Sequence, residues 1–80
     1  MHELGVLTQA LGRVQHLAEE NRIKSIKHVS LEVGELSGFV PAYFQKLYPA
    51  ARSLFPALEK SELRLFSAPG RGLVIKEIAY

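Results

Sequence analysis

The first three residues, Met1, His2 and Glu3, combine groups that can chelate a metal ion. A free terminal amine, the backbone nitrogen and imidazole of the second residue, and an oxygen or nitrogen of the third can together surround one ion. A planar, nitrogen-rich ligand set of this kind suits Ni(II) or Cu(II). The alternative is that His2 is simply an exposed residue at a frayed terminus, and these three residues alone favour that alternative.

Other kinds of chemistry find little support in the chain. It contains no cysteine, which excludes disulfides, thiol nucleophiles and thiolate metal sites. It also contains no aspartate, and no Gly-x-Ser-x-Gly turn accompanies its scattered hydroxyl residues. Neither a Walker loop nor a dinucleotide-binding fingerprint is present. We therefore predict that the protein is not an enzyme.

The length of 80 residues allows one domain, which we place at residues 1–80. Because so small a sheet has exposed strand edges, a homodimer is plausible. The formal charge of +2 is too small to require a nucleic-acid partner. No apolar run approaches the roughly 20 residues that cross a bilayer, so we expect no membrane insertion. Together with the lack of cysteine, this predicts a cytoplasmic protein.

Hydrophobic periodicity predicts the first two elements that would position the terminus. From Leu4 to about Glu20 the pattern indicates an amphipathic helix, with its inward stripe at Leu4, Leu7, Leu11, Val14 and Ala18, widened by Ala10 and Leu17. Residues 26–33 alternate like a half-buried strand. In that strand His28 and Glu32 share the polar face about 13 Å apart, which predicts surface residues rather than a shared metal site.

The second half of the chain predicts a helix and two strands. The helix begins at Pro41 and should be kinked or split at Pro49, with Leu54 and Phe55 on its second half. Residues 57–61 then form a turn. Strands at 62–66 and 73–80 should pair as a hairpin across the loop at 68–72. The predicted fold is α/β (α+β), with α-β-α-β-β order and a small three-stranded mixed sheet covered on one face by two helices.

Three segments of the chain form a recognisable set: the start Met1-His2-Glu3-Leu4 with its helix, the segment Leu31-Glu32-Val33-Gly34-Glu35-Leu36-Ser37-Gly38 with Val40-Pro41, and the ending Gly72-Leu73-Val74-Ile75-Lys76-Glu77-Ile78. Together they resemble the HypA family of nickel-incorporation proteins. Each motif is weak alone, but their order and spacing cover nearly the whole chain. The resemblance implies a nickel metallochaperone that helps to mature nickel-iron hydrogenase and, in some organisms, urease.

The resemblance also implies a site and partners. In that family the Met-His-Glu end binds Ni(II) through the histidine imidazole and nearby backbone nitrogens, which places the site on Met1, His2 and Glu3. The implied partners are the nickel-supplying GTPase and the hydrogenase large subunit. Family members carry a zinc-binding insert with two Cys-x-x-Cys pairs between the last two strands, whereas this chain has only the short segment at 67–72, so no zinc is expected. Pro49 departs from the uninterrupted second helix of the family.

Two alternatives to nickel delivery stay open. The first is a metal-independent interaction module, in which aromatic residues line a partner or dimer surface: Phe39, Tyr43, Phe44 and Tyr48. Several of these aromatic residues must instead belong to the core. The second is weak nucleic-acid binding through a loose basic cluster formed by Arg13, Arg22, Lys24 and Lys27, which should depend strongly on salt.

Overall fold

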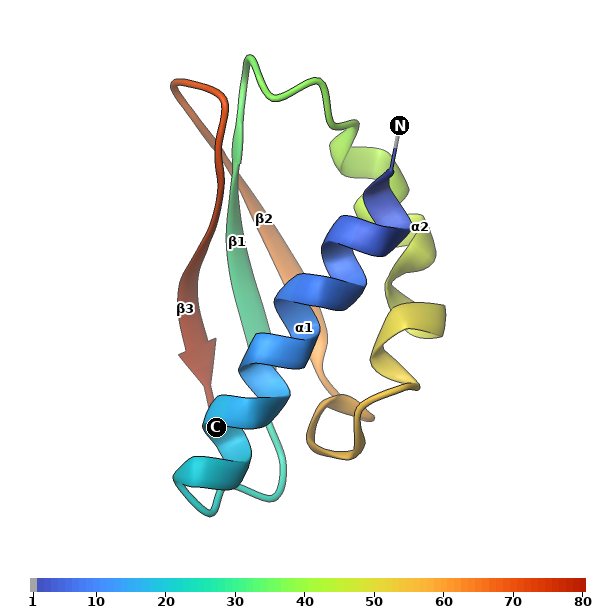
Figure 1. The fold of residues 1–80 in the computed structure, drawn as a ribbon, viewed down its shortest axis with the longest axis vertical. Coiled ribbons are helices and arrows are strands. Elements are labelled where there is room, and N and C mark those ends of the chain that lie inside the picture. The colour runs from blue at the N-terminus through green and yellow to red at the C-terminus, as the bar shows by residue number, and fades with distance from the viewer. Residues whose placement is uncertain (1) are drawn as a thin grey trace.

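The computed structural model describes residues 2–80, and its elements follow the predicted order (Figure 1). They are helix α1 (Glu3–Glu20), strand β1 (His28–Gly34), helix α2 (Pro41–Arg52), 3-10 helix η1 (Pro56–Leu58), strand β2 (Glu62–Ala68) and strand β3 (Leu73–Ala79). The α-β-α-β-β order and the mixed three-stranded sheet are therefore confirmed. Within residues 2–80, no helix has the length and hydrophobicity that a membrane-spanning segment needs.

Strand β1 lies in the middle of the sheet, whose strand order is β2-β1-β3. It pairs parallel to β2, with His28 opposite Glu62, and antiparallel to β3, with His28 opposite Ala79. The predicted hairpin between β2 and β3 is therefore wrong. The four residues between them, from Pro69 to Gly72, must cross two strand spacings, about 10 Å, which an extended segment of that length can span.

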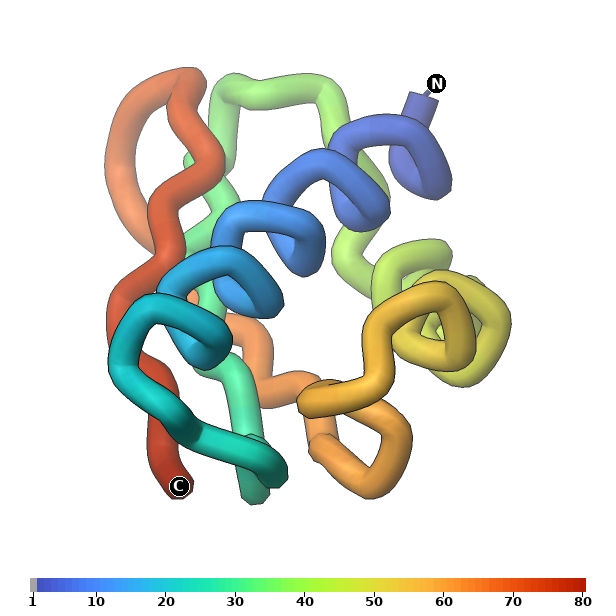
Figure 2. Tube along the Cα trace, turned by 60° about the horizontal axis from the view of Figure 1, so that its bottom comes forward, coloured from blue at the N-terminus to red at the C-terminus, as the bar shows by residue number. Residues whose placement is uncertain are grey.

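The β2–β3 loop passes across the end of β1 and is bonded to it (Figures 1 and 2). The N–H groups of Gly34, Glu35 and Leu36 donate to the carbonyls of Gly72, Ala68 and Gly70, each at 2.8 Å. A Cβ on Gly34 would lie 2.5 Å from the Gly70 carbonyl oxygen. Gly34 is thus required because the loop backbone occupies the space of a side chain.

Both helices pack on one face of the sheet and enclose a single core (Figure 2). The inward stripe of α1 is correct at its four central positions, which are fully or almost fully buried: Leu7, Leu11, Val14 and Ala18. It is wrong at its first position, Leu4, which is 47% exposed, and at Leu17, one of the two widening residues, which is 45% exposed. At the start of α1 the buried residue is instead Glu3, which is 2% exposed.

Helix α2 continues through Pro49 to Arg52, so of the two predicted effects of Pro49, a kink or a split, the split does not occur. Proline lacks an N–H and removes one helical hydrogen bond. The turn that follows is held by tertiary contacts, because Tyr48 and Ala51 on either side of Pro49 are buried. Arg52 Nη1 also donates to the carbonyl of Ser61 at 2.6 Å.

The segment after α2 leaves the helix at Arg52, so the predicted extension through Leu54 and Phe55 is also wrong. Leu54 is 63% exposed. The Phe55 ring packs partly against the core, and a Cβ on Gly12 of α1 would lie 3.7 Å from it. The predicted turn at 57–61 begins within η1, which then leads into β2.

The face of the sheet away from the helices is only partly open to solvent. Our surface assignment is wrong for His28, whose side chain is 16% exposed, with Nε2 3.6 Å from Glu77 Oε1. Ser30 is 2% exposed. Across this face the Lys76 ammonium lies 4.2 Å from the centroid of the Phe66 ring. Neighbouring side chains therefore cover the polar face of β1.

Candidate metal site

The end of β1 leads into a short loop, residues 35–40, whose shape is fixed by its own hydrogen bonds. Ser37 Oγ donates to the Gly34 carbonyl at 2.6 Å and accepts from the Phe39 N–H at 3.2 Å. Gly38 adopts φ of 81°, in the left-handed region that favours glycine. The Phe39 ring meets Phe44 edge-on, with centroids 5.6 Å apart. These contacts hold the next residue, Val40, in a defined position at the start of α2.

The carboxylate of Glu3 joins this loop to the start of α1. Its Oε2 accepts the Val40 N–H at 3.0 Å, across 37 residues of sequence. The Val40 hydrogen bond lowers the pKa of the Glu3 carboxyl below its ordinary value of 4.5, and burial opposes the shift. A carboxylate in the first turn of a helix also faces the positive end of the helix dipole. Glu3 therefore attaches the amino-terminal end of α1 to the loop between β1 and α2.

His2 immediately precedes this attachment and is exposed. It occupies the N-cap position of α1 with φ of −102° and ψ of 44°, and its side chain makes no capping hydrogen bond. Its carbonyl accepts the Val6 N–H at 3.0 Å, so its backbone belongs to the first helical turn. The His2 backbone is thus held at a fixed place in the fold, and its exposed imidazole is not engaged in a capping hydrogen bond.

The remaining predicted ligand, Met1, lies outside the described residues. Within residues 2–80 no three His, Cys, Asp or Glu side chains come together in a way that could hold a metal ion.

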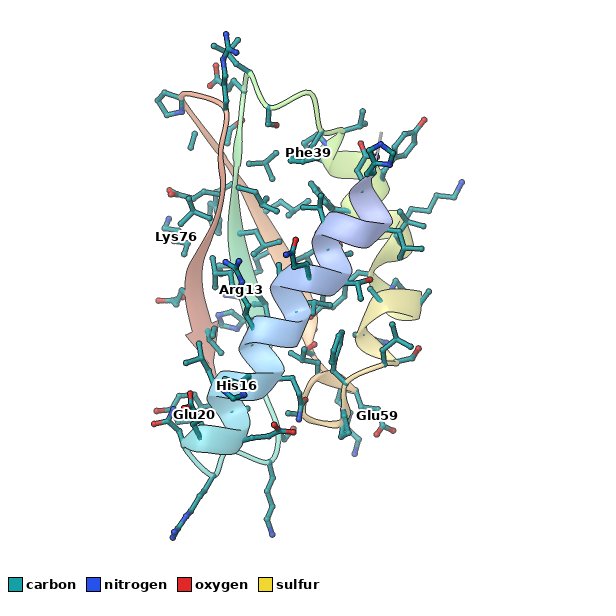
Figure 3. All side chains as sticks on the ribbon, in the orientation of Figure 1. Arg13, His16, Glu20, Phe39, Glu59 and Lys76 are labelled. Carbon is teal, nitrogen blue, oxygen red and sulfur yellow. The ribbon has the colours of Figure 1, made fainter. Side chains whose placement is uncertain are left out.

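The other two histidines lie away from this end. His16 is on the lower half of α1 in Figure 3, beside Glu20, with His16 Nε2 3.6 Å from Glu20 Oε1 and its side chain 72% exposed. This confirms the prediction of a surface histidine on the first helix. His28 lies at the start of β1.

A groove of about 510 Å³ opens beside His2, between the beginning of α1 and α2. Its lining residues are His2, Glu3, Leu4, Gly5, Tyr43, Lys46 and Leu47. Leu4 and Tyr43 expose about half of their side chains, at 47% and 51%. The sequence analysis did not predict the groove or the roles of Gly5 and Lys46 in lining it, because the position of these residues depends on how the two helices pack. The one signal in the sequence was that a glycine is unfavourable within a helix.

Of the four aromatic residues proposed to line a partner surface, two belong to the core. Phe44 is 0% exposed and Tyr48 is 3% exposed, while Phe39 is partly buried against them. Only Tyr43 among the four is exposed, and it is the one that lines the groove. The structure therefore reduces the aromatic surface to a single residue beside His2.

The chain is similar in sequence and in fold to metallochaperones. Residues 1–74 match the profile of the family described as "Hydrogenase/urease nickel incorporation, metallochaperone, hypA". The chain therefore belongs to the HypA family, as its motifs indicated. A search of curated proteins gives no match.

Two solved structures share the fold. The "Solution structure of the Ni metallochaperone HypA from Helicobacter pylori" superimposes with a TM-score of 0.77 at 17% identity, covering 96% of this chain and 72% of that one. The "Solution structure of HypA protein" gives a TM-score of 0.71, also at 17% identity, covering 96% of this chain and 71% of that one. At this identity the likeness establishes the arrangement of helices and strands, and the family profile establishes the role in nickel incorporation.

Proposed function

We propose that this chain is a nickel metallochaperone that binds Ni(II) at Met1, His2 and Glu3 and passes the ion to a maturing nickel enzyme. The observation that carries the proposal is the exposed His2 side chain, which makes no capping bond and stands on a backbone held at the first turn of α1. Family membership makes nickel the expected cargo. Imidazole and amide nitrogens at a chain terminus form the planar ligand set that Ni(II) accepts.

In this proposal the three residues have different tasks. Met1 supplies the terminal amine, and His2 supplies its imidazole and backbone nitrogen. Because the Glu3 carboxylate is buried against Val40, Glu3 contributes a backbone nitrogen and holds the ligands in place through its side chain. Protons compete with the metal for these nitrogen ligands, so acid should release the ion.

The acceptor in this proposal is the hydrogenase large subunit, and the donor is the nickel-supplying GTPase. The family role in nickel incorporation supports contact with proteins that give and receive the ion. The chain has no cysteine, so the proposal assigns it no thiolate zinc site. We propose the cytoplasm as the compartment.

Calorimetric titration of Ni(II) into untagged protein with its native terminus tests the proposal. We expect stoichiometric binding that is lost in His2→Ala and in amino-terminally acetylated protein. His16→Ala is a matched control, because it removes an exposed histidine from the same helix, and it should bind nickel like the original chain. Equal binding in the His2→Ala and His16→Ala variants would contradict the assignment.

The second candidate is a metal-independent interaction module, which the exposed Tyr43 and Leu4 favour. Under this candidate, binding of the hydrogenase large subunit survives His2→Ala and is lost in Tyr43→Ala. Under the nickel proposal, His2→Ala abolishes nickel transfer even when the two proteins still associate. A pull-down with the purified large subunit, followed by measurement of the nickel it receives, separates the two.

A further inference from the structure

We propose that the groove beside His2 binds an acidic segment of the protein that exchanges nickel with this chain. The inference rests on the proposed nickel function, and it adds the chemistry of the partner at that site. The groove lies between the start of α1 and α2, so a segment seated there would be directly next to the His2 imidazole. Its volume of about 510 Å³ is enough for a few side chains.

The charge of the groove favours an acidic occupant. The only acidic residue in its lining is Glu3, whose Oε2 accepts the Val40 N–H at 3.0 Å, from the loop before α2. Lys46 is exposed, and within residues 2–80 it makes no ion pair. Of the two charged side chains in the lining, the Glu3 carboxylate is buried against Val40 and Lys46 is exposed without an ion pair to a described residue, so a carboxylate entering the groove would meet the Lys46 ammonium.

Gly5 gives the groove its room. A Cβ built on Gly5 would have no atom within 4 Å, so the fold itself does not require a glycine there. This distinguishes it from Gly34, where loop backbone fills the position. Glycine nevertheless weakens a helix relative to alanine. An open position of this kind allows a partner backbone to approach α1 closely.

The exposed apolar residues of the groove indicate that the bound segment also carries an apolar side chain. Leu4 and Tyr43 are about half exposed, and Leu47, which also lines the groove, is partly buried against the core. Such a lining takes an apolar side chain together with a charged one, since a large rigid side chain such as tyrosine commonly anchors a peptide. The occupant is thus a segment in which a carboxylate neighbours an apolar residue.

Selection of a displayed random-peptide library on the metal-free protein tests this inference. We expect the selected peptides to be enriched in Asp or Glu next to an apolar residue. One such synthetic peptide is then measured by fluorescence anisotropy, and its binding should weaken about tenfold or more in both Gly5→Leu and Lys46→Gln. Selection without acidic enrichment, or no selected binder at all, would overturn the proposal.

Two control variants make the test specific to the groove. Gln9→Leu adds the same side chain to an exposed position one helical turn further along α1, outside the groove lining. Lys24→Gln removes an exposed lysine elsewhere. Both should bind the peptide like the original chain. If Gly5→Leu binds as well as Gln9→Leu, the groove is not the site.

Nickel titration distinguishes the groove inference from the nickel-binding proposal, and light scattering distinguishes it from dimerisation through the groove. Gly5→Leu and Lys46→Gln should bind Ni(II) like the original chain, so a loss of peptide with nickel retained locates the effect in the groove. Peptide binding by a chain that binds no nickel would overturn the link to nickel exchange. A dimer that Gly5→Leu converts to a monomer would show that a second copy occupies the groove, and would overturn the proposal too.

Discussion

Two buried polar contacts attach the helices of this protein to the segments beneath them, and they differ in charge. At the amino-terminal end, the Glu3 carboxylate takes the Val40 N–H at 3.0 Å. In the body of the protein, the Tyr48 hydroxyl lies 2.6 Å from Ser61 Oγ, and Ser61 Oγ also donates to the Leu58 carbonyl at 2.7 Å. The first contact is a hydrogen bond to a charged acceptor and adjoins the candidate site, whereas the second joins neutral groups and lies within the core.

The two contacts should therefore fail at opposite ends of the pH range. The pKa of Glu3 is lowered by the Val40 hydrogen bond, so its contribution is present above its unfolded pKa and is lost as pH falls. Burial raises the pKa of Tyr48 above 10.0, so its contribution is present below that value and is lost as pH rises. The comparison shows that the end of the molecule carrying His2 is the part whose attachment acid would weaken.

The largest expected change in stability comes from a substitution at Gly34, where β1 ends and the loop that presents Val40 begins. In Gly34→Ala the new Cβ would lie 2.5 Å from Gly70 O and 2.8 Å from Gly72 N, both backbone atoms that cannot move aside cheaply. We expect a loss of about 3 kcal/mol in the free energy of unfolding, typical of severe overpacking. Urea denaturation measures it.

Gly72→Ala is the matched control for this substitution. It lies in the same crossing, but its Cβ would have no atom within 4 Å. We expect its stability to change by no more than about 0.5 kcal/mol. If both variants lose the same stability, the close approach at Gly34 is not the cause.

The next effect tests the neutral contact through Tyr48→Phe. The ring still fills its place in the core, while the bond to Ser61 is removed. Ser61 Oγ retains the Leu58 carbonyl as its acceptor, so no buried group is left without a partner. We expect a loss of about 1 kcal/mol in the free energy of unfolding. The stability of the variant should also fall less between pH 9 and pH 11 than that of the original chain.

Much of the fold was predictable because it follows from local patterns. The periodicity of Leu7, Leu11 and Val14 identified α1, and the alternation of Val29, Leu31 and Val33 identified β1. Strand pairing was not predictable in the same way. The short β2–β3 loop is compatible both with a hairpin and with a crossing over β1, and only the pairing of both edges of β1 decides between them.

In the candidate site, too, local motifs were predictable from the sequence and tertiary contacts were not. The sequence motifs pointed to His2, and they also pointed to the segment from Val33 to Gly38 without giving its physical role. In the structure, this segment forms hydrogen bonds with the β2–β3 loop and leads to Val40, whose N–H binds Glu3. The reversal at the start of α1, with Glu3 buried and Leu4 exposed, could not be foreseen, since its cause is an N–H donor 37 residues away.

The bond from the Val40 N–H to the Glu3 carboxylate is tested by Glu3→Gln in the metal-free protein. The amide can still accept the Val40 N–H but cannot titrate, so the contribution of Glu3 to the acid dependence of the stability should disappear. Between neutral pH and pH 3, the stability of Glu3→Gln should fall less than that of the original chain. Urea denaturation across this range measures the difference. Parallel curves for the two proteins would show that the Val40 bond adds nothing to the charged form.

The smallest effect has the opposite sign and concerns Gly5. Gly5→Ala places a methyl group in open space on α1, and alanine favours the helix over glycine by up to about 1 kcal/mol at interior positions. Since Gly5 lies in the first turn, we expect a gain of about 0.5 kcal/mol. Thermal unfolding with Gly12→Ala as the comparison measures it, because a Cβ on Gly12 would meet Phe55 at 3.7 Å, an ordinary contact. A gain in stability in Gly5→Ala would mean that glycine makes the first turn of α1 less stable than alanine would, while it keeps the groove beside His2 open. A loss would mean that Gly5 serves the helix itself, and the amino-terminal end would then differ from the core only in the charge of its attachment.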